Sequence, residues 1–190
     1  AASIRKGLAM GAAIAVQIAD EKLLGADLRL TAQVLAAAIE KTGYDLVIAG
    51  NSSTDGSGGM VPAMIAELLG VVSATGLSTV EITDGAVTGT RPIDGGSQTI
   101  TATLPAVISI SEALPDARFP NFKGIMAAKK KPFETLSLAD LAIDADDLSQ
   151  AHSIMLTVAE RPPREAGVKI VDEGDAGEKL AEFLIQNRLV

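Results

Sequence analysis

The sequence predicts an α/β fold in which a doubly wound, mostly parallel sheet carries helices on both faces. Apolar runs at residues 13–18 and 44–49 each come before a stretch of helical periodicity, at residues 27–42 and 60–69. Strands and helices that alternate with short connections are typical of such a sheet. The second run is apolar over nearly its whole length, as expected for a strand that is covered on both faces.

Length and composition predict one domain with an appendage. The chain has 190 residues, of which 47% are hydrophobic, and this is enough for a substantial core. It contains no cysteine, which excludes disulfides and thiol chemistry. The net charge of −8 argues against general binding of nucleic acid.

No membrane insertion is expected, because no apolar run reaches the roughly 20 residues that a membrane-spanning helix needs. No signal peptide is visible, so we expect a cytoplasmic protein. The chain begins with Ala1-Ala2-Ser3 and enters a helical pattern at once. From this start we expect that an N-terminal part of the protein is missing.

The helices of the first half have recognisable boundaries. A short helix is predicted over residues 3–11. Asp27 is suited to cap the second helix, and Gly43 follows that helix where a left-handed residue is favoured. Pro62 is tolerated in the first turn of the third helix, which Gly70 ends. The second helix has an apolar face formed by Leu28, Ala32, Leu35 and Ile39.

The middle of the chain has the pattern of antiparallel strands. Two short strand patterns, residues 79–83 and 86–90, flank Asp84-Gly85, which is a two-residue hairpin signal. A turn at residues 94–96 leads into another alternating strand, residues 97–103. We therefore expect an antiparallel hairpin element that joins the parallel sheet.

The last third begins with a buried strand and then loosens. Residues 106–110 form an apolar strand pattern, and residues 111–120 are loop-like, with two prolines. A short helix is predicted over residues 122–131, and residues 144–164 are predicted to be an extended connector. A terminal helix follows at residues 175–187.

The terminal helix is amphipathic. Asp175 and Glu178 are spaced as a capping pair at its start. Its apolar stripe, which includes Leu180, Phe183 and Leu184, must pack against another surface. The pattern leaves two alternatives open, packing onto its own domain and packing onto a second chain.

A loop of small residues between the second strand and the third helix is the clearest candidate for a ligand site. Free N–H groups and the positive end of the helix dipole favour an anion there, and glycine permits close approach to the backbone. The loop is neither a P-loop nor a GxGxxG motif. The spacing alone fits equally a nucleotide-phosphate site and a glycine-rich turn.

Other residues that often carry chemistry form no recognisable site. Asp144, Asp146 and Asp147 lack the spacing of an EF-hand and are interpreted as a solvated turn. His152 is the only histidine, so it cannot form a multi-histidine metal site, and no carboxylate is spaced with it as in a catalytic triad. We therefore predict no catalytic residues and no metal site.

Four stretches of the sequence resemble the beta subunit of electron transfer flavoprotein. They are residues 45–50 with the loop at 54–56, residues 94–96, residues 104–108 and residues 118–131. The most specific part is the IMAAKKK helix at residues 125–131. Order and spacing match from about Ser3 to Leu141, and the terminal helix resembles the tail of bacterial members.

The resemblance implies an adenine-nucleotide-binding, HUP-like fold over residues 1–141. Residues 142–190 would form a connector and a C-terminal helix that packs on a partner subunit. The family forms a heterodimer in which the alpha subunit holds most contacts to FAD. The beta subunit usually carries a structural AMP.

The function that the resemblance implies is electron transfer in the bacterial cytoplasm, connected with fatty acid oxidation. Electrons would pass from flavin-dependent dehydrogenases through FAD to a downstream quinone oxidoreductase or a similar acceptor. An electron-bifurcating relative, with a second FAD in place of AMP, is an alternative. A stand-alone ATP-binding signalling domain of the same broad fold is another, and it would need no alpha subunit.

By position, the resemblance places AMP at the glycine-rich loop. The cofactor-binding residues would be Gly50, Asp55, Gly56, Gly58, Gly59, Met60 and Val61. The phosphate would contact the last four, while Asp55 and Gly56 would shape the loop. Because some relatives have polar side chains at positions 58, 59 and 61, we expect backbone N–H groups to hold the phosphate in this chain.

The resemblance also implies a recognition loop that docks onto partner dehydrogenases. Its residues would be Arg118, Phe119, Phe122, Lys123, Ile125 and Met126. Phe122 takes the position of the apolar anchor, and an aromatic ring flanked by cations is typical of an interface hot spot. The alternative is that Phe119 and Phe122 plug the loop onto its own domain. Three lysines, residues 129–131, would complement the dipole of the preceding helix.

Overall fold

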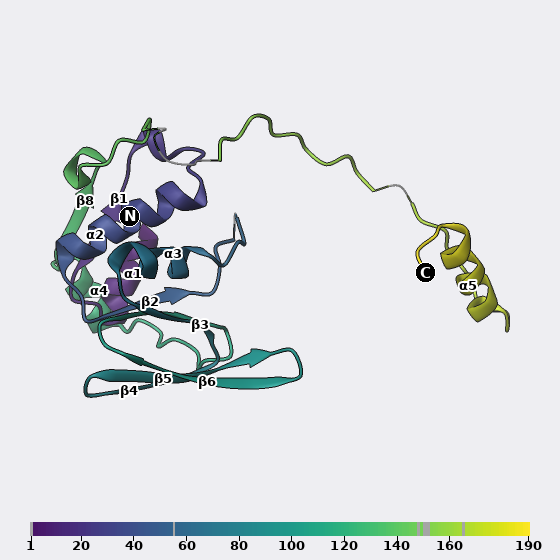
Figure 1. The fold of residues 1–190 in the computed structure, drawn as a ribbon, viewed down its shortest axis with the longest axis horizontal. Helices are drawn as coiled ribbons and strands as arrows, with labels where there is room; N and C mark the ends of the chain where they lie inside the picture. The colour runs from purple at the N-terminus through teal and green to yellow at the C-terminus, as the bar shows by residue number, and fades with distance from the viewer. Residues whose placement is uncertain (1, 55, 148, 150–152, 165) are drawn as a thin grey trace. The chain divides into compact units, whose positions relative to one another are not determined.

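The computed structural model describes residues 2–54, 56–147, 149, 153–164 and 166–190. The chain divides into two compact units, Ala1–Met155 and Leu156–Val190. The first unit contains all the strands of the described chain, and the second contains a single helix (Figure 1). Each unit is described by itself below.

The centre of the first unit is a parallel sheet of three strands. Its order is β2 (Leu46–Gly50), β7 (Ala106–Ile110) and β3 (Val72–Leu77). Val47 of β2 and Ser73 of β3 are both in register with Val107 of β7. The predicted β2 and β7 are confirmed, whereas β3 was not expected.

Two further parallel strands form a separate sheet. It consists of β1 (Ala15–Ile18) and β8 (Phe133–Leu136), with Ala15 opposite Phe133. The prediction of one continuous sheet is therefore wrong for the described residues, whose parallel strands form two sheets. The strand β8 was also not expected, because Glu134 and Thr135 in its middle are polar and leave no apolar run.

The antiparallel strands form a sheet of their own. The hairpin of β4 (Thr79–Thr83) and β5 (Ala86–Ile93) turns at Asp84-Gly85, and a second turn leads to β6 (Gly96–Thr103). Both predicted turns are confirmed. The expectation that this element joins the parallel sheet is wrong, because β4, β5 and β6 pair only with one another.

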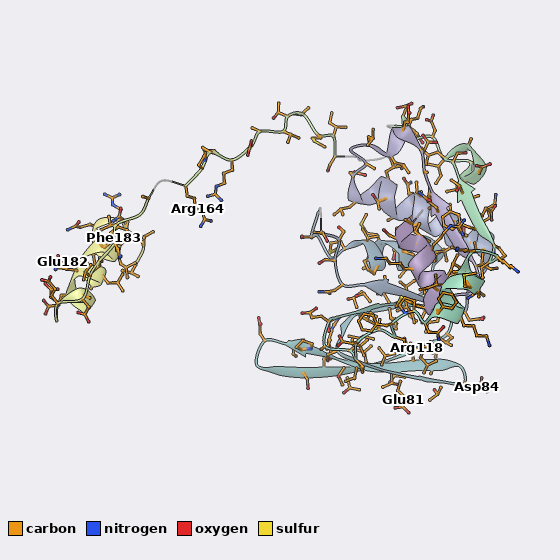
Figure 2. The ribbon with its side chains drawn as sticks, turned by 180° about the vertical axis from the view of Figure 1, so that it is seen from behind. Glu81, Asp84, Arg118, Arg164, Glu182 and Phe183 are labelled. Carbon is orange, nitrogen blue, oxygen red and sulfur yellow. The ribbon has the colours of Figure 1, made fainter. Side chains whose placement is uncertain are left out.

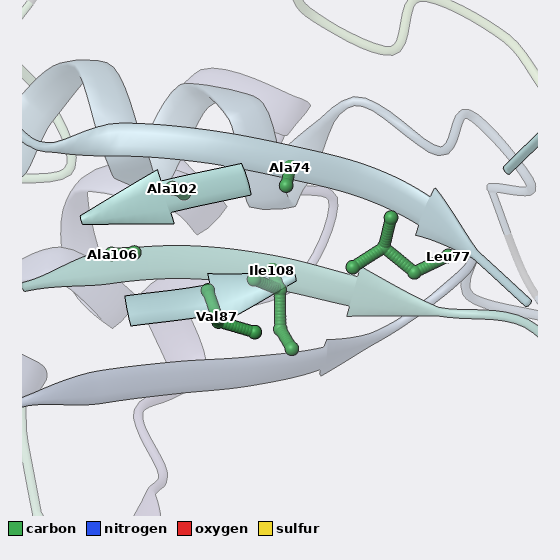
Figure 3. Packing of buried hydrophobic residues seen from close by; sticks show 6 residues of the cluster. All are labelled: Ala74, Leu77, Val87, Ala102, Ala106 and Ile108. Carbon is green, nitrogen blue, oxygen red and sulfur yellow. The ribbon is translucent and has the colours of Figure 1, made fainter. Parts of the chain in front are cut away.

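The central strand β7 is buried on both faces, whereas Ile48 of β2 is 54% exposed, so the expectation that the second apolar run is covered on both faces is wrong. On one face Ile108 packs with Val87 and Ala102 of the antiparallel sheet, in the cluster drawn in Figure 3. On the other face Val107 packs against α2 (Leu28–Thr42) and α3 (Val61–Leu69). Figure 1 shows these helices and the antiparallel sheet on opposite sides of β2 and β3. Full burial of a side chain such as Ile108 contributes roughly 1.5–3 kcal/mol.

The helix α2 has two buried faces. Ala32, together with Leu35 and Ile39 of the predicted apolar face, packs toward α3 and the central sheet. Leu28, the first residue of that predicted face, is instead exposed. A second face, with Leu30 and Val34, packs against Leu138 and the β1 side of the unit. The prediction of one apolar face on this helix was therefore incomplete.

Two short helices pack closely at the β1–β8 side. They are α1 (Ala2–Met10) and α4 (Phe122–Ala128), and Leu8 and Ala128 are buried in their shared cluster. Gly124 makes the approach possible, since a Cβ atom there would lie 2.4 Å from the carbonyl oxygen of Ala9. The 3-10 turns Glu21–Leu23 and Ala139–Leu141 complete the unit.

The second unit is built around α5 (Ala176–Gln186). The predicted helix is confirmed, but the predicted capping pair is wrong. Asp175 makes no side-chain cap hydrogen bond and instead forms an ion pair of 2.9 Å with Lys179. Within α5, all of whose residues are described, none is buried, and Phe183 is among the exposed apolar side chains (Figure 2).

Candidate functional site

A cavity of about 440 Å³ lies where β2 ends and α3 begins. The loop after β2 forms one wall, and the N-terminal turns of α2 and α3 form the others. The lining residues are Ala26, Asp27, Leu28, Thr31, Leu35, Ala49, Gly50, Asn51, Ser52, Ser53, Gly56, Gly58, Gly59, Val61, Pro62 and Ile65. The carboxyl end of a parallel strand is the usual place for a ligand in open α/β sheets.

The structure brings together most of the residues predicted to bind the cofactor. The five that line the cavity are Gly50, Gly56, Gly58, Gly59 and Val61. Met60 does not line it, and its side chain is 54% exposed. Asp55 lies outside the described residues.

The two helix N-termini at the cavity differ in how they are capped. Asp27 caps α2, since its Oδ1 accepts a 2.8 Å hydrogen bond from the N–H of Leu30. Its Oδ2 accepts another, of 2.8 Å, from the N–H of Ser153. At α3 the N-cap residue is Met60, which makes no side-chain hydrogen bond to the helix. The carboxylate of Asp27 therefore already occupies the start of α2, where it disfavours an anion. Met60 places no such group at the start of α3.

The loop before α3 depends on glycine. Gly59 has φ +63°, a left-handed conformation in which a side chain is strained. A Cβ atom on Gly58 would lie 3.4 Å from the side chain of Leu28, across the cavity. The turn itself is closed by the N–H of Ser57, which donates a 2.9 Å hydrogen bond to the carbonyl of Ser53.

The wall contributed by α2 was not predicted as part of the site. Leu28 and Leu35 of α2, together with Ile65 of α3, give the cavity an apolar side. Thr31 of α2 donates its hydroxyl to the carbonyl of Asp27 at 2.8 Å. The available signal was the repetition of strand followed by helix, because the N-termini of such helices lie at the carboxyl ends of the strands. The sequence assigned Asp27 only a capping role.

The predicted docking residues lie on the loop before α4 and on α4 itself. Phe119 is 94% exposed and Phe122 is 79% exposed, so the alternative in which these rings plug the loop onto its own domain is wrong. Ile125 and Met126 are also exposed. Asn121 fixes the start of α4, since its Oδ1 accepts a 2.7 Å hydrogen bond from the N–H of Gly124.

Lys131, the last of the three lysines after α4, acts differently from the prediction. The helix ends at Ala128. Lys131 donates hydrogen bonds to the carbonyl oxygens of Leu8 at 2.8 Å and Ala12 at 2.6 Å, at the end of α1. It therefore complements the C-terminus of a neighbouring helix, and not that of its own.

Asp20 and Asp140 have lowered pKa values, and both lie away from the cavity. Hydrogen bonds from the N–H groups of Lys22 and Leu138 lower the pKa of Asp20. The hydroxyl and N–H of Ser137 lower the pKa of Asp140. Both groups are in the turns beside β1 and β8, where they hold the backbone.

Among the residues that the structure describes, no three acidic or histidine side chains are grouped so that they could hold a metal ion. His152 lies outside those residues. Over the same described part of the chain, no helix is both long and apolar enough to cross a membrane.

Comparison with known proteins identifies the family. Residues 1–141 match the model of the electron transfer flavoprotein domain. The chain is 45% identical to a protein of Mycobacterium leprae over 99% of this chain and 72% of the relative. It is 46% identical to one of Mycobacterium tuberculosis over the same shares, and 36% identical to one of Syntrophomonas wolfei over 96% of this chain and 69% of the relative. All three relatives are named electron transfer flavoprotein subunit beta. The chain therefore belongs to the family of electron transfer flavoprotein beta subunits.

Proposed function

We propose that this chain pairs with an alpha subunit and that its cavity beside β2 holds a structural AMP. The heterodimer carries electrons from flavin-dependent dehydrogenases to a quinone oxidoreductase or a similar acceptor. FAD, held mostly by the alpha subunit, supplies the redox chemistry. The role of this chain is to bind its partners and to position them.

One observation supports the AMP site above the others. The start of α3, without a side-chain cap from Met60, opens into a cavity that also has apolar lining residues on α2 and α3. The N–H groups around Gly59 and Val61 are suited to a phosphate, and the side chains of Leu28, Leu35 and Ile65 are suited to a purine ring. Asp27 favours this orientation, because a carboxylate at the start of α2 repels a phosphate there.

Analysis of released nucleotides tests the proposal. The full-length gene product is purified with its alpha subunit, denatured and analysed by chromatography. We expect one AMP and one FAD per heterodimer. Two FAD per heterodimer would instead indicate the electron-bifurcating alternative, in which the same loop binds the phosphates of a second flavin. ATP bound to this chain purified alone would indicate the signalling domain.

Gly58→Ala tests whether the cavity is the AMP site. Gly58 and Leu28 both line the cavity, and a Cβ atom on Gly58 would lie 3.4 Å from the side chain of Leu28, an ordinary contact that the fold tolerates. The added methyl group lies between the loop and Leu28, and we expect AMP affinity to fall at least about tenfold, since each lost hydrogen bond to a charged group is worth roughly 1.5–3 kcal/mol. Gly96→Ala is the matched control, because its Cβ enters open space in β6. Equal AMP content in both variants would place AMP elsewhere.

The unit Leu156–Val190 is proposed to bind the alpha subunit. Its helix α5 exposes Leu180, Phe183 and Ile185, and apolar side chains of this size are favoured at protein interfaces. Deletion of the residues after Arg164 should lower the yield of heterodimer on co-purification. If the truncated chain binds the alpha subunit as tightly as the full chain, this unit is a local appendage.

A further inference from the structure

A groove of about 830 Å³ lies between α1, α4 and the loop at residues 116–120. We call it the cationic groove. Its lining residues are Ala2, Arg5, Lys6, Ala9, Met10, Asp116, Ala117, Arg118, Phe119, Pro120, Ile125, Ala128 and Lys129. Most of these side chains are apolar, and the charged ones are four cations and one carboxylate.

The charged lining of the groove is mainly cationic, although the chain has a net charge of −8. Arg5 is engaged within the fold, since it lies 4.9 Å from the ring centre of Phe133 and donates a 3.4 Å hydrogen bond to the carbonyl of Ala128. Within the described part of the chain, Lys6, Arg118 and Lys129 form no ion pair. An apolar groove with three such cations complements an apolar group flanked by carboxylates.

We infer that the cationic groove receives an apolar side chain flanked by carboxylates from the docking dehydrogenase, so that docking is reciprocal. This inference rests on the proposed function, in which Phe122 enters a pocket of that dehydrogenase. The ring of Phe122 and the groove are then two parts of one interface.

The structure divides the predicted docking residues in a way that fits this arrangement. Arg118, Phe119 and Ile125 line the groove, whereas Phe122, Lys123 and Met126 do not. The two sets share one loop and one helix, so a protein that contacts the ring of Phe122 also lies beside the groove. Phe119, which is 94% exposed, lines the groove and offers an aromatic ring of the kind favoured at interfaces.

Charge reversal at adjacent lysines tests the groove. Lys129→Glu changes a groove residue, and Lys130→Glu changes the next residue, which is also exposed and does not line the groove. The heterodimer with each variant is reduced by the flavin dehydrogenase that reduces the wild type, at low ionic strength. We expect Lys129→Glu to raise the apparent KM about five- to tenfold and Lys130→Glu to change it little, with kcat unaltered in both. If both variants raise the apparent KM equally, the general positive charge of this surface, and not the groove, favours docking. That result would overturn the inference.

Phe122→Ala separates this inference from the proposed function. If Phe122→Ala raises KM while Lys129→Glu does not, the groove is not used and docking by the loop stands. If neither variant changes KM, docking by this loop is wrong as well.

A cross-link identifies what covers the groove. A photo-reactive phenylalanine derivative replaces Ala117, an exposed groove residue, in the heterodimer. We expect an adduct with the dehydrogenase that wild-type heterodimer competes away. An adduct formed only with the alpha subunit, or within this chain, would show that another occupant fills the groove and would overturn the inference.

Discussion

The Nζ atom of Lys131 donates a 2.8 Å hydrogen bond to the carbonyl oxygen of Leu8. Lys131 follows α4, and Leu8 lies in the last turn of α1. The last carbonyl groups of a helix have no partner within the helix, and a cation beside them also complements the dipole. This one side chain therefore joins the ends of the two helices that border the docking loop.

Lys131→Met should destabilise the first unit. The variant keeps the length of the apolar stem but removes the ammonium group that bonds to Leu8 and Ala12. We expect the free energy of unfolding to fall by roughly 1–3 kcal/mol. Urea unfolding of the heterodimer measures this, with Lys130→Met as the control. A loss of the same size in the control would show that general charge, and not these bonds, is responsible.

Gly124→Ala and Gly7→Ala should have effects of opposite sign. An added Cβ at Gly124 would lie 2.4 Å from the backbone oxygen of Ala9, so α4 would have to move, at a cost of roughly 1–3 kcal/mol. At Gly7, inside α1, a Cβ meets nothing within 4 Å. Alanine there should stabilise by roughly 0.5–1 kcal/mol. Melting temperatures that move in the same direction would contradict the close contact between α1 and α4.

Asp20→Asn should change how stability depends on pH. The N–H groups of Lys22 and Leu138 bond to the Asp20 carboxylate at 3.0 and 3.1 Å and hold its pKa below the usual range. The charged form therefore stabilises the fold above the unfolded pKa of about 4, and this contribution is lost as the pH falls through the lower, folded pKa. The variant should be less stable than wild type at neutral pH, and the gap should close in acid. Glu21→Gln is the control, and a gap that persists in acid would contradict this cause.

Phe122→Ala should impair docking without affecting folding. Its ring is 79% exposed, so its removal leaves no cavity in the core. If the ring enters a partner pocket, its burial contributes roughly 1.5–3 kcal/mol and its loss raises the apparent KM for the dehydrogenase. Flavin reduction by a small chemical reductant should stay the same, as should FAD and AMP content. A melting temperature lower by many degrees, with unchanged kinetics, would show instead that the ring has a structural role.

The parallel strands that the sequence revealed are those with a nearly continuous apolar run, whereas the antiparallel strands were revealed by their turns and their alternation. Val107 and Ile108 of β7 are buried on opposite faces, and such a strand is visible as an apolar run. The strand β3 was hidden because Ser73 and Thr75 are polar and Gly76 interrupts the ladder. The N–H of Gly76 instead donates a 2.8 Å hydrogen bond to the hydroxyl oxygen of the buried Ser109. Ser109 is far from Gly76 in the sequence, so the sequence alone does not reveal this bond.

The loop of the candidate site was predictable because its glycines are local signals, and five of the seven predicted residues line the cavity. Its other wall was not predictable, since Leu28 and Leu35 reach the loop only through the packing of α2 on α3. Pairing between strands is equally non-local. Ala15 and Phe133 are opposite each other in β1 and β8, although they are far apart in the chain.

The two buried faces of α2 make it an element of two cores at once. Ala32 belongs to the core of the central sheet, and Val34, two residues later, belongs to the core beside β1 and Leu138. If α2 frays, both cores open to water together, so the two sides of the unit lose order as one cooperative block. The cavity lies at the N-terminus of this helix. A nucleotide bound there would consequently hold both halves of the domain against unfolding, although it contacts only one of them.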